Sequence, residues 1–562
     1  MLNLNFTEAL IRRRPALLLG AVTGLCCLVF FGSEDDYNSA TFTALLIAAL
    51  LIFGCFLFKM VRDNRCVPKK AALMFFGAVL SGILLTVALL LTPCRAFVIG
   101  MAGAVSLALL WGCFIKRGTM NTQKAVLLLF AAAFLIRLVY VLYTGIYERQ
   151  HDVETFGGGI GHAGYIEYFY NNARLPDFDV RDVWQFYHPP LHHILAAVHL
   201  RLMTFLGVSY EAATESLQML TLYYSMVALL VSYRILRELQ ISEKALIAVF
   251  AVLCFHPTFV IFSGSINNDI LSVSFSLAAL LYAIRWYKQC TFRNILKIAL
   301  CIGLGMMTKL SSWMVAPAVA FLFLLALIKN PQKINRGRYF LQLLSFGAVC
   351  LPLGLWWSVR NYLLWNVPPS YVPRLEVTNF QYIGDHSVFD RLFNFNFRQF
   401  SSVYDRWGDP YFEFNPTVGL LKTAMFGEYI NDTNFPSIIA VGFLLFWLGV
   451  ILAAVSVFAY FAVGLKDRKM PAAFRLFLLL SVATVLVMYY YFCLDFPFTC
   501  TQNIRYAAVT IPIGAAFIGR LLMIKNGKHF KFKAVLNRCI YTACGLFCLN
   551  SVAVFLMISL YR

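Results

Sequence analysis

Apolar runs recur along almost the whole chain, and most approach the roughly 20 residues that a helix needs to cross a lipid bilayer. Hydrophobic residues make up 60% of the 562 residues and charged residues only 13%, whereas about 25% of an ordinary soluble domain is charged. A soluble core cannot bury so much apolar surface. Intrinsic disorder, a disulfide-stapled scaffold and a free-standing nucleic-acid binder are therefore excluded, despite a net charge of +20. The sequence predicts an all-α polytopic membrane protein.

The apolar runs predict about fifteen membrane-spanning helices, two of which are short. They lie at 15–31, 40–60, 71–92, 96–115, 124–146, 217–236, 244–263, 270–287, 293–307, 312–328, 339–358, 436–463, 473–493, 506–523 and 535–558. The connecting loops alternate between a set rich in Lys and Arg, such as 59–70 and 520–538, and a set rich in Asp and Glu. Because basic loops stay in the cytoplasm, the pattern predicts an N-terminus inside and a C-terminus outside.

Two of the predicted outer loops are too long to be simple connections. They cover about 148–216 and about 359–435. Within the first loop, 189–207 is long enough to cross the bilayer, but three histidines and an arginine would then lie in lipid, which is costly. We therefore expect a juxtamembrane helix that lies along the outer surface, after an extended segment fixed by two prolines.

The first outer loop concentrates groups that could carry chemistry. Seven carboxylates lie between residues 148 and 182, and six of the nine histidines lie between residues 151 and 199. Carboxylates grouped at a helix end suit general-base catalysis at a membrane surface, although a solvated acidic loop has the same composition. His188, His192 and His199 are spaced as metal ligands on one helix face would be. The same spacing is typical of a polar stripe at the level of the lipid headgroups.

Six short motifs follow one another along the predicted helical core. They are Asp152-Val153-Glu154, His188-Pro189-Pro190-Leu191, Asn267-Asn268-Asp269-Ile270-Leu271, Gly303-Leu304-Gly305-Met306-Met307-Thr308-Lys309, Trp356-Trp357-Ser358-Val359-Arg360-Asn361 and Arg505-Tyr506. Their order over roughly residues 124–523 resembles that of the family-39-like GT-C glycosyltransferases, which include protein O-mannosyltransferases and lipid A aminoarabinose transferases. The chain differs from them in having Asp-Val-Glu for an adjacent Asp-Glu pair, and in having His188 where some relatives have lysine.

The resemblance implies a GT-C-like helical bundle over residues 121–562. The first four predicted spans lie outside the resemblance and form a four-helix transmembrane extension at 1–120. It implies inverting transfer of a sugar from a polyprenyl-phosphate donor to a glycan, lipid or protein acceptor on the outer face of the membrane. Asp152 would be the general base and Glu154 its support. The donor phosphate would be bound by Arg360, Arg505, Lys309 and His188, with Asp269, Asn268 and Arg137 in supporting roles. No cofactor is certain, and candidate ligands for a divalent metal ion are His151, Glu154 and His162.

Other classes of membrane protein share part of this pattern. A transporter or lipid flippase would also be polytopic with charges near the membrane, and a lipid-linked glycan ligase or polymerase would also have a long outer loop late in the chain. Cations such as Arg360 and Lys309 could simply extend to the lipid headgroups. The aromatic motifs of the second outer loop, 404–410 and 426–429, could cover the donor, select the acceptor or form an interfacial belt. We expect a bacterial plasma membrane, with the active site on the extracytoplasmic side.

Overall fold

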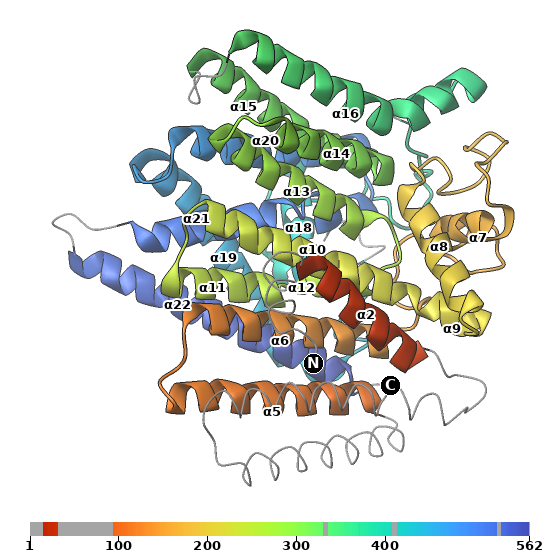
Figure 1. Ribbon diagram of the computed structural model, residues 1–562. Coiled ribbons are helices and arrows are strands. Elements are labelled where there is room, and N and C mark those ends of the chain that lie inside the picture. The colour runs from red at the N-terminus through yellow and green to blue at the C-terminus, as the bar shows by residue number, and fades with distance from the viewer. Residues whose placement is uncertain are drawn as a thin grey trace, which may run out of the picture.

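The computed structural model describes residues 15–31, 94–329, 335–369, 371–406, 413–524 and 530–560. Within these ranges the chain is a bundle of helices (Figure 1), and its only β-type pairing is an isolated bridge between Tyr382 and Phe498. The all-α prediction is confirmed. The predicted spans 40–60 and 71–92 lie outside the described residues.

The long helices lie roughly side by side along the bundle (Figure 1). They are α5 (Arg95–Lys116), α6 (Thr122–Tyr143), α10 (Leu217–Glu238), α11 (Glu243–Phe255) followed by α12 (Pro257–Gly264), α13 (Asp269–Lys288), α14 (Phe292–Thr308), α15 (Ala316–Lys329), α16 (Arg336–Trp365), α19 (Ile439–Lys466), α20 (Ala472–Asp495), α21 (Thr510–Met523) and α22 (Phe530–Ile558). The shorter helices are α2 (Pro15–Phe31), α7 (Gly161–Asn172), α8 (Leu191–Phe205), α9 (Tyr210–Glu215), α17 (Val388–Phe393) and α18 (Pro416–Phe426), with 3₁₀ turns η1 (Leu310–Val315), η2 (Phe397–Phe400), η3 (Pro436–Ile438), η4 (Thr499–Thr501) and η5 (Ile504–Tyr506).

The number of membrane spans is smaller in the described residues than the predicted total. Ten helices there are long and apolar enough to cross a bilayer, or eleven if the bent pair Thr499–Tyr506 and Thr510–Met523 is one span. The predicted spans 15–31 and 293–307 correspond to α2 and α14, which have only 17 residues each. The protein is therefore a multi-pass membrane protein, and the total of fifteen spans remains a prediction.

The loops predicted to be cytoplasmic meet at one end of the bundle. Glu238, at the end of α10, forms ion pairs of 2.7 Å with Arg285 and Lys288 at the end of α13. Arg520 of α21 pairs at 2.7 Å with Asp467, which follows α19. Helices α7, α8 and α9, which belong to the first predicted outer loop, gather at the opposite end (Figure 1). The two sets of loops thus occupy opposite ends, as the alternation of charge predicts.

Helix α14 runs back along α13 and brings its end to the start of that helix. It begins at Thr291, whose hydroxyl accepts a hydrogen bond of 3.3 Å from the backbone N–H of Asn294. It ends before Lys309, whose backbone is extended (φ −151°, ψ 124°). Packing of α14 against α13 and α16 fixes Lys309 beside the first turn of α13.

Helix α8 has the two faces expected of an interfacial helix. Its 15 residues are too few for it to be among the candidate spans, and it exposes apolar side chains such as Leu202 and Phe205. The opposite face points into the bundle, where His192 and His193 are 1% and 0% exposed. The alternative of a polar stripe at the headgroups is wrong for His192, because this residue is packed inside the protein.

Candidate active site

Asp152 lies in the segment that follows α6, where the first outer loop begins. Its backbone is in the left-handed region (φ 59°), which aspartate tolerates better than most residues. The carbonyl oxygens of Asp152 and Val153 accept hydrogen bonds of 2.9 Å from the backbone N–H groups of His162 and Ala163, in the first turn of α7. Gly161 permits this approach, since a Cβ there would lie 2.5 Å from the Val153 carbonyl oxygen. The Asp152 segment is thus fixed against the start of α7.

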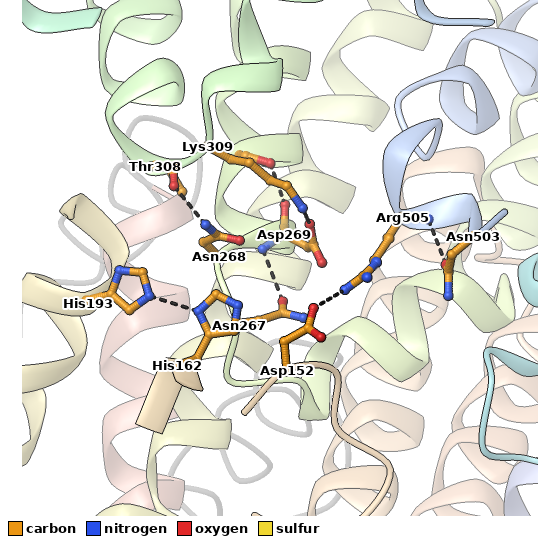
Figure 2. Close-up of polar contacts among 11 residues, drawn as sticks. Asp152, His162, His193, Asn267, Asn268, Asp269, Thr308, Lys309, Asn503 and Arg505 are labelled. Atoms are coloured by element: carbon orange, nitrogen blue, oxygen red, sulfur yellow. Dashed lines mark hydrogen bonds and ion pairs between the residues drawn. The ribbon is translucent and has the colours of Figure 1, made fainter. Parts of the chain in front are cut away.

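Arg505 reaches Asp152 from the far end of the sequence. Its Nη1 atom lies 3.0 Å from Oδ2 of Asp152 (Figure 2). Arg505 belongs to the 3₁₀ turn η5, and its backbone N–H donates a hydrogen bond of 2.9 Å to Oδ1 of Asn503. The arginine side chain is 6% exposed, whereas that of Asp152 is 32% exposed and borders the cavity described below.

A second ion pair lies beside the first one. Asp269 is the first residue of α13, and its carboxylate pairs with the ammonium group of Lys309, which follows α14. The side-chain amide of Asn268 donates a hydrogen bond of 3.0 Å to the carbonyl oxygen of Thr308. The backbone N–H of Asp269 is bonded to Oδ1 of Asn267 at 3.1 Å. These bonds hold the end of α14 against the start of α13 (Figure 2).

Both ion pairs border one cavity of about 580 Å³. Its other polar walls are His162, His188, Ser358, Asn361 and the pair Arg374–Asp495, and much of its lining is aromatic: Tyr187, Trp313, Trp357, Tyr371, Tyr489, Tyr491, Phe492, Phe496 and Tyr506. A partly exposed carboxylate therefore shares an enclosed space with fixed cations and flat apolar surfaces. Such a site can remove a proton, stabilise a negative charge and hold a bulky amphipathic ligand.

The charge states of the cavity follow from its burial and its cations. Burial alone would raise the pKa of Asp152, but the charge of Arg505, with smaller effects of His162 and His151, outweighs burial and lowers this pKa. Burial lowers the pKa of His162 to about 3. It also holds the pKa of His188 well below its usual range. At neutral pH Asp152 is therefore ionised and both histidines are uncharged.

The histidines of the first outer loop form a packed cluster. Nδ1 of His162 lies 2.9 Å from Nε2 of His193, and the rings of His162 and His188 stack with their centroids 5.6 Å apart. His192 bonds the carbonyl oxygen of Ile266 at 2.8 Å. Uncharged rings can stack and share protons in this way without mutual repulsion.

The three candidate metal ligands do not come together in the part of the chain that the structure describes. His151 pairs with Glu428, His162 bonds His193, and the Glu154 side chain is exposed. Across the described residues, no three His, Cys, Asp or Glu side chains come together as they would around a metal ion. His199, also a candidate by its spacing, bonds the hydroxyl of Ser216 at 2.9 Å.

Five predicted site residues do not border the cavity: Glu154, whose side chain is exposed, Asn268, His151, Arg360 and Arg137. Arg360 bonds the carbonyl oxygen of Pro176 and packs on the rings of Trp357 and Trp365, with its guanidinium 5.1 and 4.7 Å from their centroids. Arg137 is fully buried in α6 and bonds the hydroxyl of Ser225 at 2.9 Å. At the cavity the structure therefore brings together Asp152, Arg505, Lys309, His188, Asp269 and His162, but it leaves Glu154, Asn268, His151, Arg360 and Arg137 outside the lining.

The sequence alone did not indicate several polar residues of the site. Glu428 and Asn503 lie behind the first ion pair, and Arg374 pairs with Asp495 at 2.9 Å in the cavity wall. Of these residues, only Glu428 lies in a sequence motif, the aromatic motif 426–429 of the second outer loop. Isolated polar residues such as Arg374 look like ordinary loop residues until the fold brings them to the cavity.

Residues 187–357 match the family described as Dolichyl-phosphate-mannose-protein mannosyltransferase. The predicted resemblance to GT-C glycosyltransferases is confirmed. The matched segment includes His188, Asp269 and Lys309 of the cavity, and it supports a membrane glycosyltransferase. No curated protein matches the chain.

Two solved structures have a similar helical arrangement. ArnT from Cupriavidus metallidurans bound to undecaprenyl phosphate is 13% identical with a TM-score of 0.46, over 78% of this chain and 77% of that one. AglB from Archaeoglobus fulgidus, in complex with an inhibitory peptide and a dolichol-phosphate, is 13% identical with a TM-score of 0.44, over 77% of this chain and 56% of that one. At these values the likeness is one of overall arrangement only.

Proposed function

We propose that the protein transfers a sugar from a polyprenyl-phosphate donor to an acceptor hydroxyl, with inversion at the anomeric carbon. The observation that carries the proposal is the single cavity that joins Asp152 to Arg505 and Lys309. A sugar linked to a lipid phosphate offers an electrophilic carbon and an anionic leaving group, and the cavity provides a base and cations for them. The family match over residues 187–357 supports the same class of reaction.

Asp152 acts as the general base in this proposal. The acceptor oxygen attacks the anomeric carbon as its proton passes to the carboxylate, and the bond between that carbon and the phosphate oxygen breaks. Arg505 neutralises Asp152 at 3.0 Å and makes it a weak base. A donor phosphate that bonds Arg505 reduces this effect and brings the pKa of Asp152 closer to the working pH, where a base is most effective.

Arg505 and Lys309 stabilise the departing lipid phosphate. Arginine presents a planar fork that binds two phosphate oxygens, and lysine acts as a compact point charge. Both lie in the cavity wall next to a carboxylate, Asp152 or Asp269, that orients them before the donor arrives. Such preorganised charges are usually the largest contribution to catalysis of this kind.

We place this site on the extracytoplasmic side of the membrane. The support is that the cavity lies at the end of the bundle opposite to Arg285, Lys288 and Arg520, which belong to basic loops. Sugar nucleotides are made in the cytoplasm, so an outward-facing enzyme needs a donor carried by a lipid.

The experiment is incubation of the purified protein with a panel of polyprenyl-phosphate sugars and candidate glycan, lipid and protein acceptors, with detection of the released polyprenyl phosphate. We expect release from at least one donor, and its loss in Asp152→Asn, which removes the base but keeps the size of the side chain. Size-exclusion profiles of both proteins should coincide. A wild-type protein that moves lipid between leaflets without releasing polyprenyl phosphate would overturn the proposal in favour of a flippase.

A further inference from the structure

Glu428 lies directly behind the ion pair of Asp152 and Arg505 and contacts a neighbour of each. Its side chain is 2% exposed, and it follows the C-terminal end of α18 in the second outer loop. We propose that Glu428 is the positioning residue that holds Asp152 and Arg505 at the distance and orientation of their ion pair. The expected effect of Glu428 on turnover rests on the proposed function, whereas its expected effect on the distance between Asp152 and Arg505 does not.

One oxygen of Glu428 fixes the Asp152 side of the pair. Oε2 lies 3.2 Å from Nδ1 of His151, the residue immediately before Asp152. The His151 side chain is itself 6% exposed, and its ring packs against Tyr429 with centroids 5.2 Å apart. The backbone that carries Asp152 is therefore tied to the second outer loop as well as to α7.

The other oxygen of Glu428 fixes the Arg505 side. Oε1 accepts a hydrogen bond of 2.5 Å from Nδ2 of Asn503. The remaining polar atom of that amide, Oδ1, accepts the backbone N–H of Arg505 at 2.9 Å. The amide of Asn503 cannot rotate without losing one of these bonds. Glu428 therefore fixes the position of the Arg505 backbone.

Helix α18 supports the same segment at the two residues on either side of Asn503. Nε2 of Gln502 donates to the carbonyl oxygen of Glu413 at 2.8 Å, just before α18. The backbone N–H of Ile504 donates to the hydroxyl of Thr423, within α18, at 3.0 Å. Glu413 is anchored in turn by a buried ion pair of 2.6 Å with Lys422. Three consecutive residues, 502 to 504, thus bond α18 or its flanks.

Gly427 turns the chain so that Glu428 can point at both partners. It caps α18 with φ 60° and ψ −149°, a combination that only glycine adopts readily. The turn directs the Glu428 side chain toward His151 and Asn503. The position of Glu428 is therefore built into the backbone, as a positioning role requires.

The chemistry of Glu428 and Asn503 allows a reciprocal test. In Glu428→Gln the new amide can keep its oxygen toward Asn503, and its NH2 group then faces Nδ1 of His151, which accepts that bond only when the ring proton is on Nε2. In Asn503→Asp two carboxylates face each other at the 2.5 Å contact. The double variant restores every bond, because the amide introduced at position 428 donates to the carboxylate introduced at position 503 and accepts from His151.

We expect turnover to fall about 10²-fold in Asn503→Asp and in Glu428→Ala, the size of loss that a displacement near 1 Å causes. The double variant should recover most of that loss, since residues in contact couple strongly. Turnover is counted per folded molecule from size-exclusion chromatography. The matched control is Glu238→Gln, which alters a carboxylate that joins α10 to α13 at the far end of the bundle, and its turnover should not change.

Solved structures of the variants separate this inference from the proposed function. The Asp152–Arg505 distance should exceed the 3.0 Å of the native pair in Asn503→Asp, and should return in the double variant, whether or not a sugar donor has been found. An unchanged distance, or a double variant that stays as inactive as Asn503→Asp, would overturn the positioning role. If Glu428→Ala does not fold, the comparison of Asn503→Asp with the double variant still tests the positioning role. A wild-type protein without transferase activity would count against the proposed function alone.

Discussion

Asp152 and Arg505 form an ion pair of 3.0 Å although 353 residues separate them along the chain. One follows α6 and the other precedes α21, so the pair exists only when both halves of the bundle have packed. The contact makes the carboxylate and the guanidinium a single unit. Each group sets the protonation or the orientation of the other before any ligand is bound.

The fall of kcat/KM at low pH, the acid limb of its pH profile, should depend on this ion pair. Asp152 must be ionised to act as a base, and its pKa now lies below the ordinary value of about 3.9 because of Arg505. In Arg505→Gln the carboxylate loses that charge while it remains buried, so its pKa rises. The acid limb of kcat/KM should therefore move to higher pH, and kcat should fall about 10²–10³-fold through loss of phosphate stabilisation.

Arg505→Lys is the control for this shift. It keeps a positive charge near Asp152 but loses the planar fork. The acid limb should then stay close to that of the wild-type protein while turnover is still reduced. An acid limb that does not move in Arg505→Gln would show that Asp152 is not the base that the profile reports.

Lys309 and His188 should contribute unequally to donor binding. Both border the cavity, but burial keeps the pKa of His188 well below its usual range, so its ring is uncharged at neutral pH. A neutral hydrogen bond is worth about 1 kcal/mol, and His188→Gln should cost about fivefold in donor KM at most. Lys309→Gln removes a charge that pairs with Asp269 and that, in the proposed function, faces the donor phosphate, so it should cost more. Equal losses at pH 7 would contradict the assigned charge states.

Gly161 should be sensitive to the smallest substitution. Its φ is 72°, and a Cβ would lie 2.5 Å from the Val153 carbonyl oxygen. Gly161→Ala should therefore cost about 1–3 kcal/mol of backbone strain and move the segment that carries Asp152. Gly112 of α5 is the control, since a Cβ there meets nothing within 4 Å. The midpoint temperature of thermal unfolding and the turnover should both fall in Gly161→Ala, and neither should fall in Gly112→Ala.

The helical bundle was predictable because its signals are local. A run of apolar residues near 20 long and the sign of the flanking loops specify a membrane helix without knowledge of its neighbours. The helix predicted at 293–307 is present as α14 (Phe292–Thr308), but with 17 residues it is not among the candidate spans. Length alone cannot say whether so short a helix crosses the membrane or supports another helix.

The site was predictable only where a motif marked it. Asp152, Asp269, Lys309 and Arg505 stand in short motifs, and the structure brings all four to one cavity. Glu428 contacts partners more than 70 residues away in either direction, and no sequence pattern states which side chain a buried carboxylate will meet. The same limit applies to the candidate metal ligands, because nothing in the sequence states that His162 faces His193.

Arg360 should matter for stability and not for the donor. It lies outside the cavity, bonds the carbonyl oxygen of Pro176 and packs between Trp357 and Trp365. Two cation–π contacts and two hydrogen bonds, to the Pro176 carbonyl oxygen and to Oδ1 of Asn361, together predict a loss of about 2–3 kcal/mol in Arg360→Ala. Donor KM should stay unchanged, whereas the thermal midpoint should fall. Arg360→Lys keeps the charge but stacks less well, so it should lower the midpoint too. A rise in donor KM in Arg360→Ala that Arg360→Lys reverses would instead make this arginine a phosphate ligand.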